Sequence, residues 1–252
     1  WLVDAEGAFR TAPGFRKLDL EGRRAIASIG PATTDWVAVT DSAGSYEIAR
    51  IDPLGGEVFV PGGSLGTASA VPLAAAHDAS STWASFLRPD GVLVVVADAA
   101  GEVAREVFPG HEPIDLLVAA GGGAWGARRG GTGLWRFDRN GAVVEKTFTA
   151  GVTFTAVGGL TADPDGNVYV SDGPAEGSEP PPIEGDGSVV VIQPDGTLGP
   201  ALPDHLWIRP LGLHYEDTGT PGDTADDGLF VADDVVYVLP VADAGWYGFS
   251  GI

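Results

Sequence analysis

A short unit recurs along the 252-residue chain: a run of strand-forming residues enters a tight turn that closes on glycine. Phe15–Gly22, Ile48–Gly55, Leu134–Gly141 and Val189–Gly196 all fit this frame. Glycine closes such turns because it adopts a positive φ at little cost. The closing glycines, about 45 residues apart on average, are Gly22, Gly55, Gly101, Gly141, Gly196 and Gly245. A period of this length, with several strands in each unit, is typical of a β-propeller blade.

Two other strand types precede this unit in the repeat. The nearer type ends in aspartate, as in Trp36–Asp41, Asn167–Asp172 and Gly228–Asp233. The type upstream of it is rich in small side chains, and it comprises Gly158–Asp163 and Leu211–Glu216, with fainter copies at Pro72–Asp78 and Pro113–Ala119. Small side chains suit the crowded strand nearest a propeller axis, so we assign these runs to the innermost strands. The predicted outermost strands are Arg24–Ile29, Glu102–Phe108, Ala142–Phe148 and Thr197–Leu202.

Helical patterns are nearly absent, because Gly or Pro interrupts most stretches before a helix of useful length can form. The sequence therefore predicts an all-β chain that forms one domain over 1–252: a six-bladed β-propeller of four-stranded antiparallel blades. The approximate blades are 1–31, 32–66, 67–111, 112–152, 153–206 and 207–252. In this frame the innermost strand of the first blade either precedes Trp1, or the end assignments are off by one strand.

Acidic side chains outnumber basic ones 35 to 14, which gives a formal net charge of −21. Phosphate binding needs clustered Lys and Arg, so we expect no nucleic-acid partner, and anionic membrane surfaces are disfavoured for the same reason. No apolar run approaches the roughly 20 residues needed to span a bilayer, so we expect no membrane insertion. The chain contains no Cys, which excludes disulfides, thiolate metal sites and cysteine nucleophiles.

The chain also contains no Met, and its first residues have neither the basic nor the apolar region of a signal peptide. A chain without an initiator Met is a processed protein or a piece of a longer one. We therefore expect an exported protein, extracellular or periplasmic, from which a signal peptide has been removed.

Asp163–Asp172, with the sequence DPDGNVYVSD, resembles the signature of NHL-repeat propellers and of the related gluconolactonase/SMP-30-like six-bladed propellers. Pro210–Leu213 together with Gly228–Asp233 is similar to a second, interrupted copy. The resemblance implies a six-bladed propeller and marks a fold rather than an activity.

Enzymes of the SMP-30 type hold a divalent cation in the central channel with Glu, Asn and Asp side chains. The positions here that align with the Asn and Asp ligands are Leu73, Ile114, Gly158 and Leu211, and none of them can bind a metal. Asp115 lies one position away and is a single carboxylate. This departure from the family pattern argues against a gluconolactonase-like hydrolase.

Three residues are candidates for catalysis near the channel: His77, Asp115 and His214. His77 and His214 fall on predicted innermost strands, where they are either a channel-facing base or ligand pair, or strand-end histidines bonded to nearby backbone. His111 and His205 lie in predicted loops. The sequence has no G-x-S-x-G elbow, no H-E-x-x-H motif and no phosphate-binding glycine loop.

Two acidic insertions interrupt the repeat. Gly173–Gly187 is a Pro-rich loop that either recognises a partner or is a solvated excursion. The second insertion, Glu216–Gly228, carries candidate Ca²⁺ ligands at Asp217, Asp223, Asp226 and Asp227, although its spacing matches no EF-hand. Solubility or a saline habitat explains the acidic excess without any bound cation.

We therefore predict a non-enzymatic binding or structural module that engages a protein or glycan partner through loops such as 173–187. Ca²⁺ at the second insertion is the one cofactor for which the sequence offers ligands. Two alternatives remain open. One is a propeller hydrolase or lyase of the lactonase or streptogramin-lyase kind, and the other is a subunit of an extracellular assembly whose terminal strands add to a neighbour's sheet.

Overall fold

The structure is a computed structural model. It describes residues 2–3, 9–10, 24–27, 35–40, 45–52, 56–64, 71–78, 81–98, 103–145, 152–178, 183–203, 205–216, 227–233, 236–240 and 247–249. Every regular element in these segments is a β-strand. A helix with the length and hydropathy needed to cross a membrane is absent from the described segments.

Five antiparallel sheets follow one another along the chain. The first comprises β3 (Arg24–Ala27), β4 (Asp35–Thr40), β5 (Ser45–Asp52) and β6 (Gly56–Ser64). The second comprises β7 (Val71–His77), β8 (Ser81–Arg88), β9 (Gly91–Asp98) and β10 (Val103–Gly110). The third comprises β11 (Leu116–Ala120), β12 (Gly123–Ala127), β13 (Leu134–Phe137) and β14 (Val143–Glu145).

The fourth sheet has three strands, β15 (Val157–Ala162), β16 (Val168–Asp172) and β17 (Ser188–Ile192). The fifth comprises β18 (Gly212–Glu216), β19 (Gly228–Ala232), β20 (Val236–Pro240) and β21 (Tyr247–Phe249). A separate two-stranded sheet pairs β1 (Leu2–Val3) with β2 (Phe9–Arg10).

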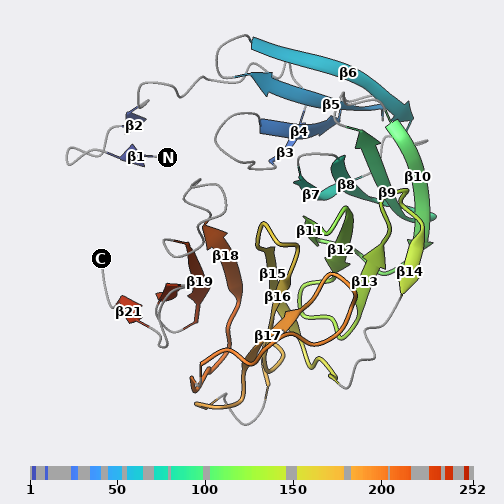
Figure 1. Cartoon of the computed structure of the whole chain (residues 1–252). Coiled ribbons are helices and arrows are strands. Elements are labelled where there is room, and N and C mark those ends of the chain that lie inside the picture. Colours follow the sequence, from blue (N-terminus) through green and yellow to red (C-terminus); the bar gives the residue numbers. More distant parts are fainter. Residues whose placement is uncertain are drawn as a thin grey trace.

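The five sheets fan around a common centre, with the first strand of each sheet nearest to it (Figure 1). These first strands contact one another in chain order: β3 contacts β7, β7 contacts β11, β11 contacts β15, and β15 contacts β18. Each sheet is a meander in which consecutive strands pair. This radial arrangement of antiparallel meanders is the β-propeller architecture.

The apolar core lies between neighbouring sheets. Trp83, from β8, packs with Phe137, from β13, at a ring-centroid distance of 6.0 Å. Another cluster joins Trp125, from β12, to Val168 and Val170, from β16. The third sheet thus buries one face against the second sheet and the other against the fourth, and the tryptophans at positions 83, 125 and 135 pack between these blades.

The structure confirms the predicted innermost strands, since Pro72–Asp78, Pro113–Ala119, Gly158–Asp163 and Leu211–Glu216 overlap β7, β11, β15 and β18. It confirms two outermost strands as β10 and β14. The assignment of Arg24–Ile29 as an outermost strand is wrong, because β3 pairs with β4 and is the innermost strand of the first sheet. The outer position of that sheet is taken by β6. For Thr197–Leu202 the structure gives one isolated bridge, between Ile192 and Leu198.

The glycine-closed turns have the expected geometry where they are described. Gly141 has φ +77° and Gly196 has φ +90°, and Gly166, in the turn before β16, has φ +84°. In the turn at Gly141, the carboxylate of Asp138 accepts the backbone N–H groups of Asn140 and Ala142. Gly22, Gly55, Gly101 and Gly245 lie outside the described residues.

The two ends of the blades differ. The turn end carries the tight turns 121–122, 138–142, 163–167 and 193–197. The loop end carries two kinds of longer segment. One kind leads into the innermost strand of a sheet, and the other joins the second and third strands of that sheet. In the last three sheets these segments are 111–115, 128–133, 152–156, 173–187 and 205–211. The candidate site described below lies at the loop end.

Candidate functional site

A β-bulge interrupts the innermost strand at the same place in two blades. In β7 the register shifts between Pro72 and Ala74, and in β15 it shifts between Val157 and Gly159. The bulged residues are therefore Leu73 and Gly158, two of the four positions that the family resemblance aligned with metal ligands. A bulged residue leaves the strand ladder, so its backbone carbonyl is open to another donor.

A guanidinium satisfies the carbonyl of Gly158. Nη1 of Arg129 donates to the carbonyl oxygen of Gly158 at 2.7 Å and to that of Leu211 at 2.9 Å. Arg129 follows β12, Gly158 belongs to β15, and Leu211 precedes β18, so one side chain joins three consecutive sheets. In a ring of blades, only a residue near the axis can reach the sheet two places further on. Arg129 therefore lies at the centre of the loop end.

The backbone of the Arg129 segment is held as firmly as its side chain. Gly130 N–H donates to the Val157 carbonyl at 2.8 Å, and Val157 N–H donates to the Gly131 carbonyl at 2.9 Å, which ties this loop to the first residue of β15. Gly130 has φ +73°, a conformation that favours glycine. The backbone N–H of Arg129 donates to the Asp115 carboxylate.

The aspartates that end the second strand type have a structural role in two blades. Asp172 accepts the backbone N–H groups of Thr155 and Ala156, and Asp233 accepts those of Ile208 and Arg209. Each carboxylate thus fixes the segment that leads into the innermost strand of its own sheet. Asp115 makes the reverse contact in the third sheet, because it sits in the lead-in segment and accepts an N–H from the loop after the second strand.

A second feature of the loop end is the turn 183–187 in the first acidic insertion. The N–H groups of Gly185 and Gly187 both donate to the Trp207 carbonyl, at 2.8 and 3.0 Å. The Asp186 carboxylate accepts the Ile183 N–H, which closes the turn on itself. Beneath it, Trp207 is 4% exposed and packs edge-on against Tyr237 at 5.2 Å.

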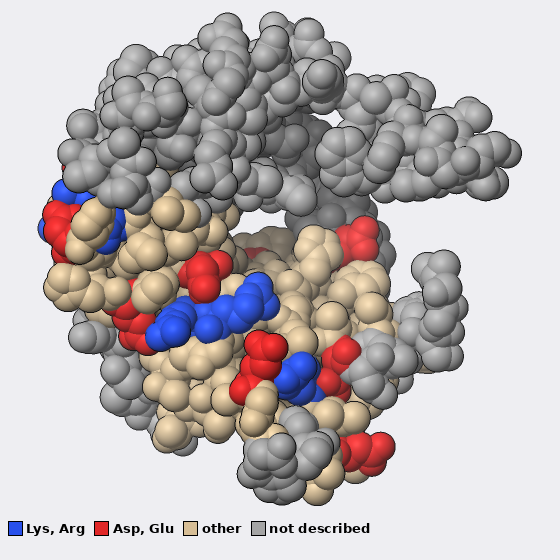
Figure 2. Space-filling model, turned by 180° about the vertical axis from the view of Figure 1, so that it is seen from behind, with Lys and Arg blue, Asp and Glu red and all other residues tan. Residues whose placement is uncertain are grey.

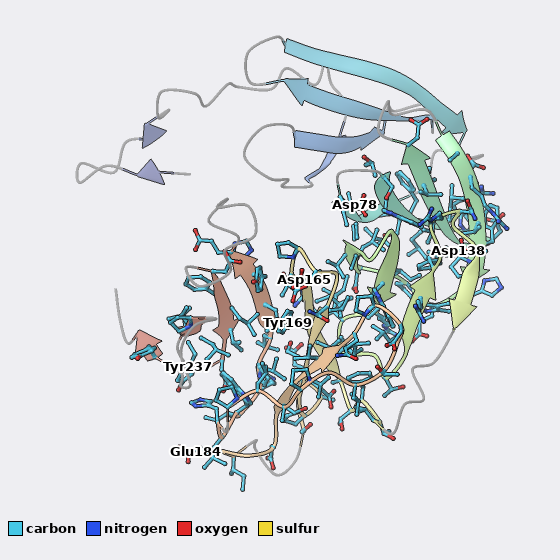
Figure 3. All side chains as sticks on the ribbon, viewed as in Figure 1. Asp78, Asp138, Asp165, Tyr169, Glu184 and Tyr237 are labelled. Carbon is cyan, nitrogen blue, oxygen red and sulfur yellow. The ribbon has the colours of Figure 1, made fainter. Side chains whose placement is uncertain are left out.

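This turn presents apolar side chains to solvent. Ile183 is 67% exposed and Leu206 is 63% exposed, the two largest values among the exposed large apolar residues of the described chain. A Cβ added to Gly185 would lie 3.8 Å from Leu206 Cδ2, so the two segments are adjacent. Glu184 and Asp186 are exposed beside them. In Figure 3, Glu184 lies at the periphery of the molecule, away from the centre of the blades.

The three catalytic candidates lie on or just before three different innermost strands. Asp115 accepts the Arg129 N–H just before β11 begins, whereas His77 is the last residue of β7. The side chain of His77 lies outside the described residues. His214 is exposed on β18, with its ring 6.3 Å from that of Phe230 on the paired strand β19. His205 lies between Trp207 and Tyr237, at 4.1 and 4.3 Å.

Of the four Ca²⁺ candidates, Asp217, Asp223 and Asp226 lie outside the described residues. Asp227 is 2% exposed and accepts the Tyr215 hydroxyl at 3.0 Å. Within the described segments no group of three or more His, Asp or Glu side chains is placed to hold a metal ion.

Two tyrosines link the turn end of the last two sheets. Asp163 accepts the Tyr169 hydroxyl at 3.1 Å, and the rings of Tyr169 and Tyr215 stack at 5.8 Å. Desolvation, reinforced by the nearby carboxylates, raises the pKa of both hydroxyls above the usual range. Asp163 also accepts the N–H of Asn167, so its carboxylate closes the turn before β16.

Sequence reasoning missed Arg129. The signal available for it was Arg128-Arg129-Gly130-Gly131, a basic pair followed by two glycines in a chain with few basic residues. Nothing in the local sequence shows that the guanidinium reaches carbonyls 29 and 82 residues further along the chain.

No protein-family model and no curated protein sequence match this chain. Among solved structures, it is similar to streptogramin B lyase, with a TM-score of 0.55 and 13% identity over 98% of this chain and 74% of that one. It is also similar to catalytically inactive virginiamycin B lyase from Staphylococcus aureus with quinupristin, with a TM-score of 0.52 and 13% identity over 92% and 72% of the two chains. At these identities the similarity shows the β-propeller fold alone.

Proposed function

We propose that this chain is a non-enzymatic binding module of an exported protein, built as a six-bladed β-propeller, which engages a protein partner through the turn 183–187 and the adjacent Leu206. Five sheets between residues 24 and 249, with the separate pair β1–β2 before them, support the count of six blades. The observation that carries the function is the rigid presentation of Ile183 and Leu206 to solvent.

Rigidity matters because binding through a flexible loop must first order that loop. Here the two hydrogen bonds to the Trp207 carbonyl already order the turn. Trp207 belongs to the core of the last sheet, with Leu229 and Val231. The exposed side chains are therefore mounted on the core of the propeller, which reduces the entropic cost of binding.

The composition of this surface indicates the chemistry of the partner. Exposed apolar side chains rimmed by polar residues are typical of protein-interaction sites. Glu184 and Asp186 make the rim acidic, and the whole chain carries a net charge of −21. The matching partner surface is apolar at its centre and carries Lys or Arg around it, because opposite charges speed association and exclude wrong partners.

No reaction is proposed. Asp115 already accepts a backbone N–H, and the contact of His214 within the described residues is with the aromatic ring of Phe230. The similarity to lyases is confined to the fold.

The proposal is tested by selecting peptides from a random phage-displayed library on the full 252-residue chain. We expect the enriched peptides to combine apolar residues with Lys or Arg, and to bind more weakly at high salt. Synthetic copies are then measured by surface plasmon resonance against Leu206→Glu and against Leu198→Glu. Leu198 is 43% exposed and follows a turn-end turn, so this control makes the same chemical change at the other end of the blades.

We expect Leu206→Glu to weaken binding by about tenfold or more, because it places a charge in the centre of the contact. Leu198→Glu should leave the affinity unchanged. Equal losses in the two variants, or peptides that bind Leu206→Glu as well as the parent chain, would disprove the location. Enrichment of acidic peptides would disprove the proposed partner chemistry.

A further inference from the structure

Within the described residues, the hydrogen bonds of Arg129 use one side of its guanidinium and leave another edge without a partner. A guanidinium has five N–H donors, and the two on Nη1 are used by the carbonyls of Gly158 and Leu211. The Nε–H and the Nη2 donors have no hydrogen-bond partner within the described part of the chain. The Nε–H and one of the two Nη2–H groups point in parallel from one side of the planar group, in the fork geometry that matches the two oxygens of a carboxylate.

The surroundings of this edge are short of anionic partners among the described residues. The Asp115 carboxylate accepts the backbone N–H of Arg129. The Asp233 carboxylate accepts the backbone N–H groups of residues 208 and 209. Arg129 makes no ion pair with any described carboxylate. Arg128 is exposed beside it, and Arg209 lies two residues before Leu211, whose carbonyl Arg129 binds.

Three arginines, Arg128, Arg129 and Arg209, thus belong to loop-end segments of a chain with only 14 basic residues. Figure 2 shows basic and acidic groups side by side on one face of the molecule, most of them below a hollow near its centre. A guanidinium that pairs with no described carboxylate is a specific feature in a strongly acidic protein, because the net negative charge opposes the approach of anions.

We propose that Arg129 is a carboxylate-binding residue at the centre of the loop end, taking its ligand through the Nε–Nη2 edge while Nη1 stays on the two carbonyls. Anchoring at both the backbone and Nη1 fixes the fork before the ligand arrives, so little side-chain entropy is lost on binding. The ligand is a molecule with a planar carboxylate, either a small organic acid or the C-terminal carboxylate of a peptide. This inference is independent of the protein-binding turn at 183–187.

The test uses the full chain labelled with ¹⁵N in its arginine side chains, titrated with four probes. The probes are sodium acetate, an acetylated dipeptide with a free C-terminus, the same dipeptide as its C-terminal amide, and inorganic phosphate. The Nε–H resonance of Arg129 is assigned by its loss in Arg129→Lys. We expect this resonance to shift with the carboxylates, with a Kd on the order of 1 mM, and to stay in place with the amide. A larger shift with the dipeptide than with acetate identifies a peptide C-terminus as the ligand, and the reverse identifies a small acid.

Arg129→Lys and Arg128→Lys form the matched pair. Lysine at 129 keeps the charge and can still donate to the carbonyls of Gly158 and Leu211, but it lacks the fork. We expect carboxylate affinity, measured by calorimetry, to fall about tenfold in Arg129→Lys and to be unchanged in Arg128→Lys. Thermal unfolding of both variants establishes that they are folded.

The proposal is overturned if the Arg129 Nε–H resonance does not move with either carboxylate, or if it moves equally with the amide. Tighter binding of phosphate than of both carboxylates would also overturn the ligand assignment. Equal weakening in the two lysine variants would show a general charge effect rather than a fork. The shifts themselves are followed in the unaltered chain, and Arg129→Lys, shown to be folded by its thermal unfolding, serves to assign the resonance.

Discussion

Ser85 and Ser171 occupy the same place in two blades but differ in their hydrogen bonds. Each lies on the second strand, opposite the residue that follows the bulge: Ser85 pairs with Ala74 and Ser171 with Gly159. Both are fully buried. The Ser85 hydroxyl donates to the Ile114 carbonyl of the next blade at 2.6 Å and accepts the Ala74 N–H at 3.2 Å. The Ser171 hydroxyl has no partner within the described residues.

Replacing each serine with alanine should therefore have different effects. Ser85→Ala removes two hydrogen bonds and leaves a buried carbonyl without a donor, so we expect it to lower the free energy of unfolding by about 2–3 kcal/mol. Ser171→Ala removes a buried hydroxyl that gains little in the folded state, so we expect a change within about 0.5 kcal/mol, or a gain of up to about 1 kcal/mol.

Urea unfolding followed by tryptophan fluorescence measures both changes on one scale, provided that the m-values agree. Because the two substitutions remove the same atom from the same strand position, packing losses cancel in the comparison. A loss of stability in Ser171→Ala as large as that in Ser85→Ala would refute the reasoning, since it would show that the hydroxyl contributes through packing and not through its hydrogen bonds.

Three further predictions follow from contacts described above. Gly158→Ala should destabilise the fold by about 3 kcal/mol in urea unfolding, because the new Cβ would meet the Pro210 carbonyl oxygen; an unchanged midpoint would contradict the close approach. Asp172→Asn should lower stability by about 2 kcal/mol, because an amide group accepts fewer of the N–H groups that the carboxylate takes up; equal stability would contradict this role. The pKa values of Tyr169 and Tyr215 are raised on folding, so the unfolded chain loses these protons first, and stability should be full below about pH 10 and fall above it. Tyr215→Phe should flatten that alkaline decline in pH-dependent urea unfolding, and an unaltered slope would count against the shift.

Much of the propeller is predictable from the sequence because its turns use local chemistry. Gly141 and Gly196 close their turns with positive φ, and Asp138 binds N–H groups no more than four residues away. Such contacts leave a pattern that repeats with the blade. The small residues of β15 and β18 likewise report a position near the axis, because larger side chains would not fit there.

The repeat pattern led to a wrong strand assignment where a segment fits two positions in the blade. Arg24–Ala27 is short and contains two alanines, so its composition suits an innermost strand, and its place after the Gly22 turn suggested an outermost one. Because this segment pairs with β4, it is the innermost strand of the first sheet. Pairing depends on the whole sheet, including the long outer strand β6, which the sequence analysis did not assign.

The candidate site was harder to predict because its contacts are distant in sequence. Histidines were predicted as candidates because their side chains can act as acid, base or ligand. In the structure, the residue at the centre of the loop end is Arg129. The aligned positions Leu73 and Gly158 matter for their backbone, since the bulge frees a carbonyl whatever the side chain is. A side-chain motif cannot report a role of this kind.

The bridge made by Arg129 bears on how the blades lose their structure. In repeat proteins each unit usually interacts with its immediate neighbours, so stability is approximately a sum of terms for single units and for adjacent pairs. Arg129 adds an interaction between the third and fifth sheets, across the fourth, as well as one with the fourth itself. Fraying of the fourth sheet would thus break the bond to Gly158 and remove the close backbone contact of Gly158 with Pro210 and Leu211 in the segment before β18. The three sheets are expected to open as a single cooperative unit rather than one after another, and this part of the ring should exchange its amide protons with one common free energy of opening.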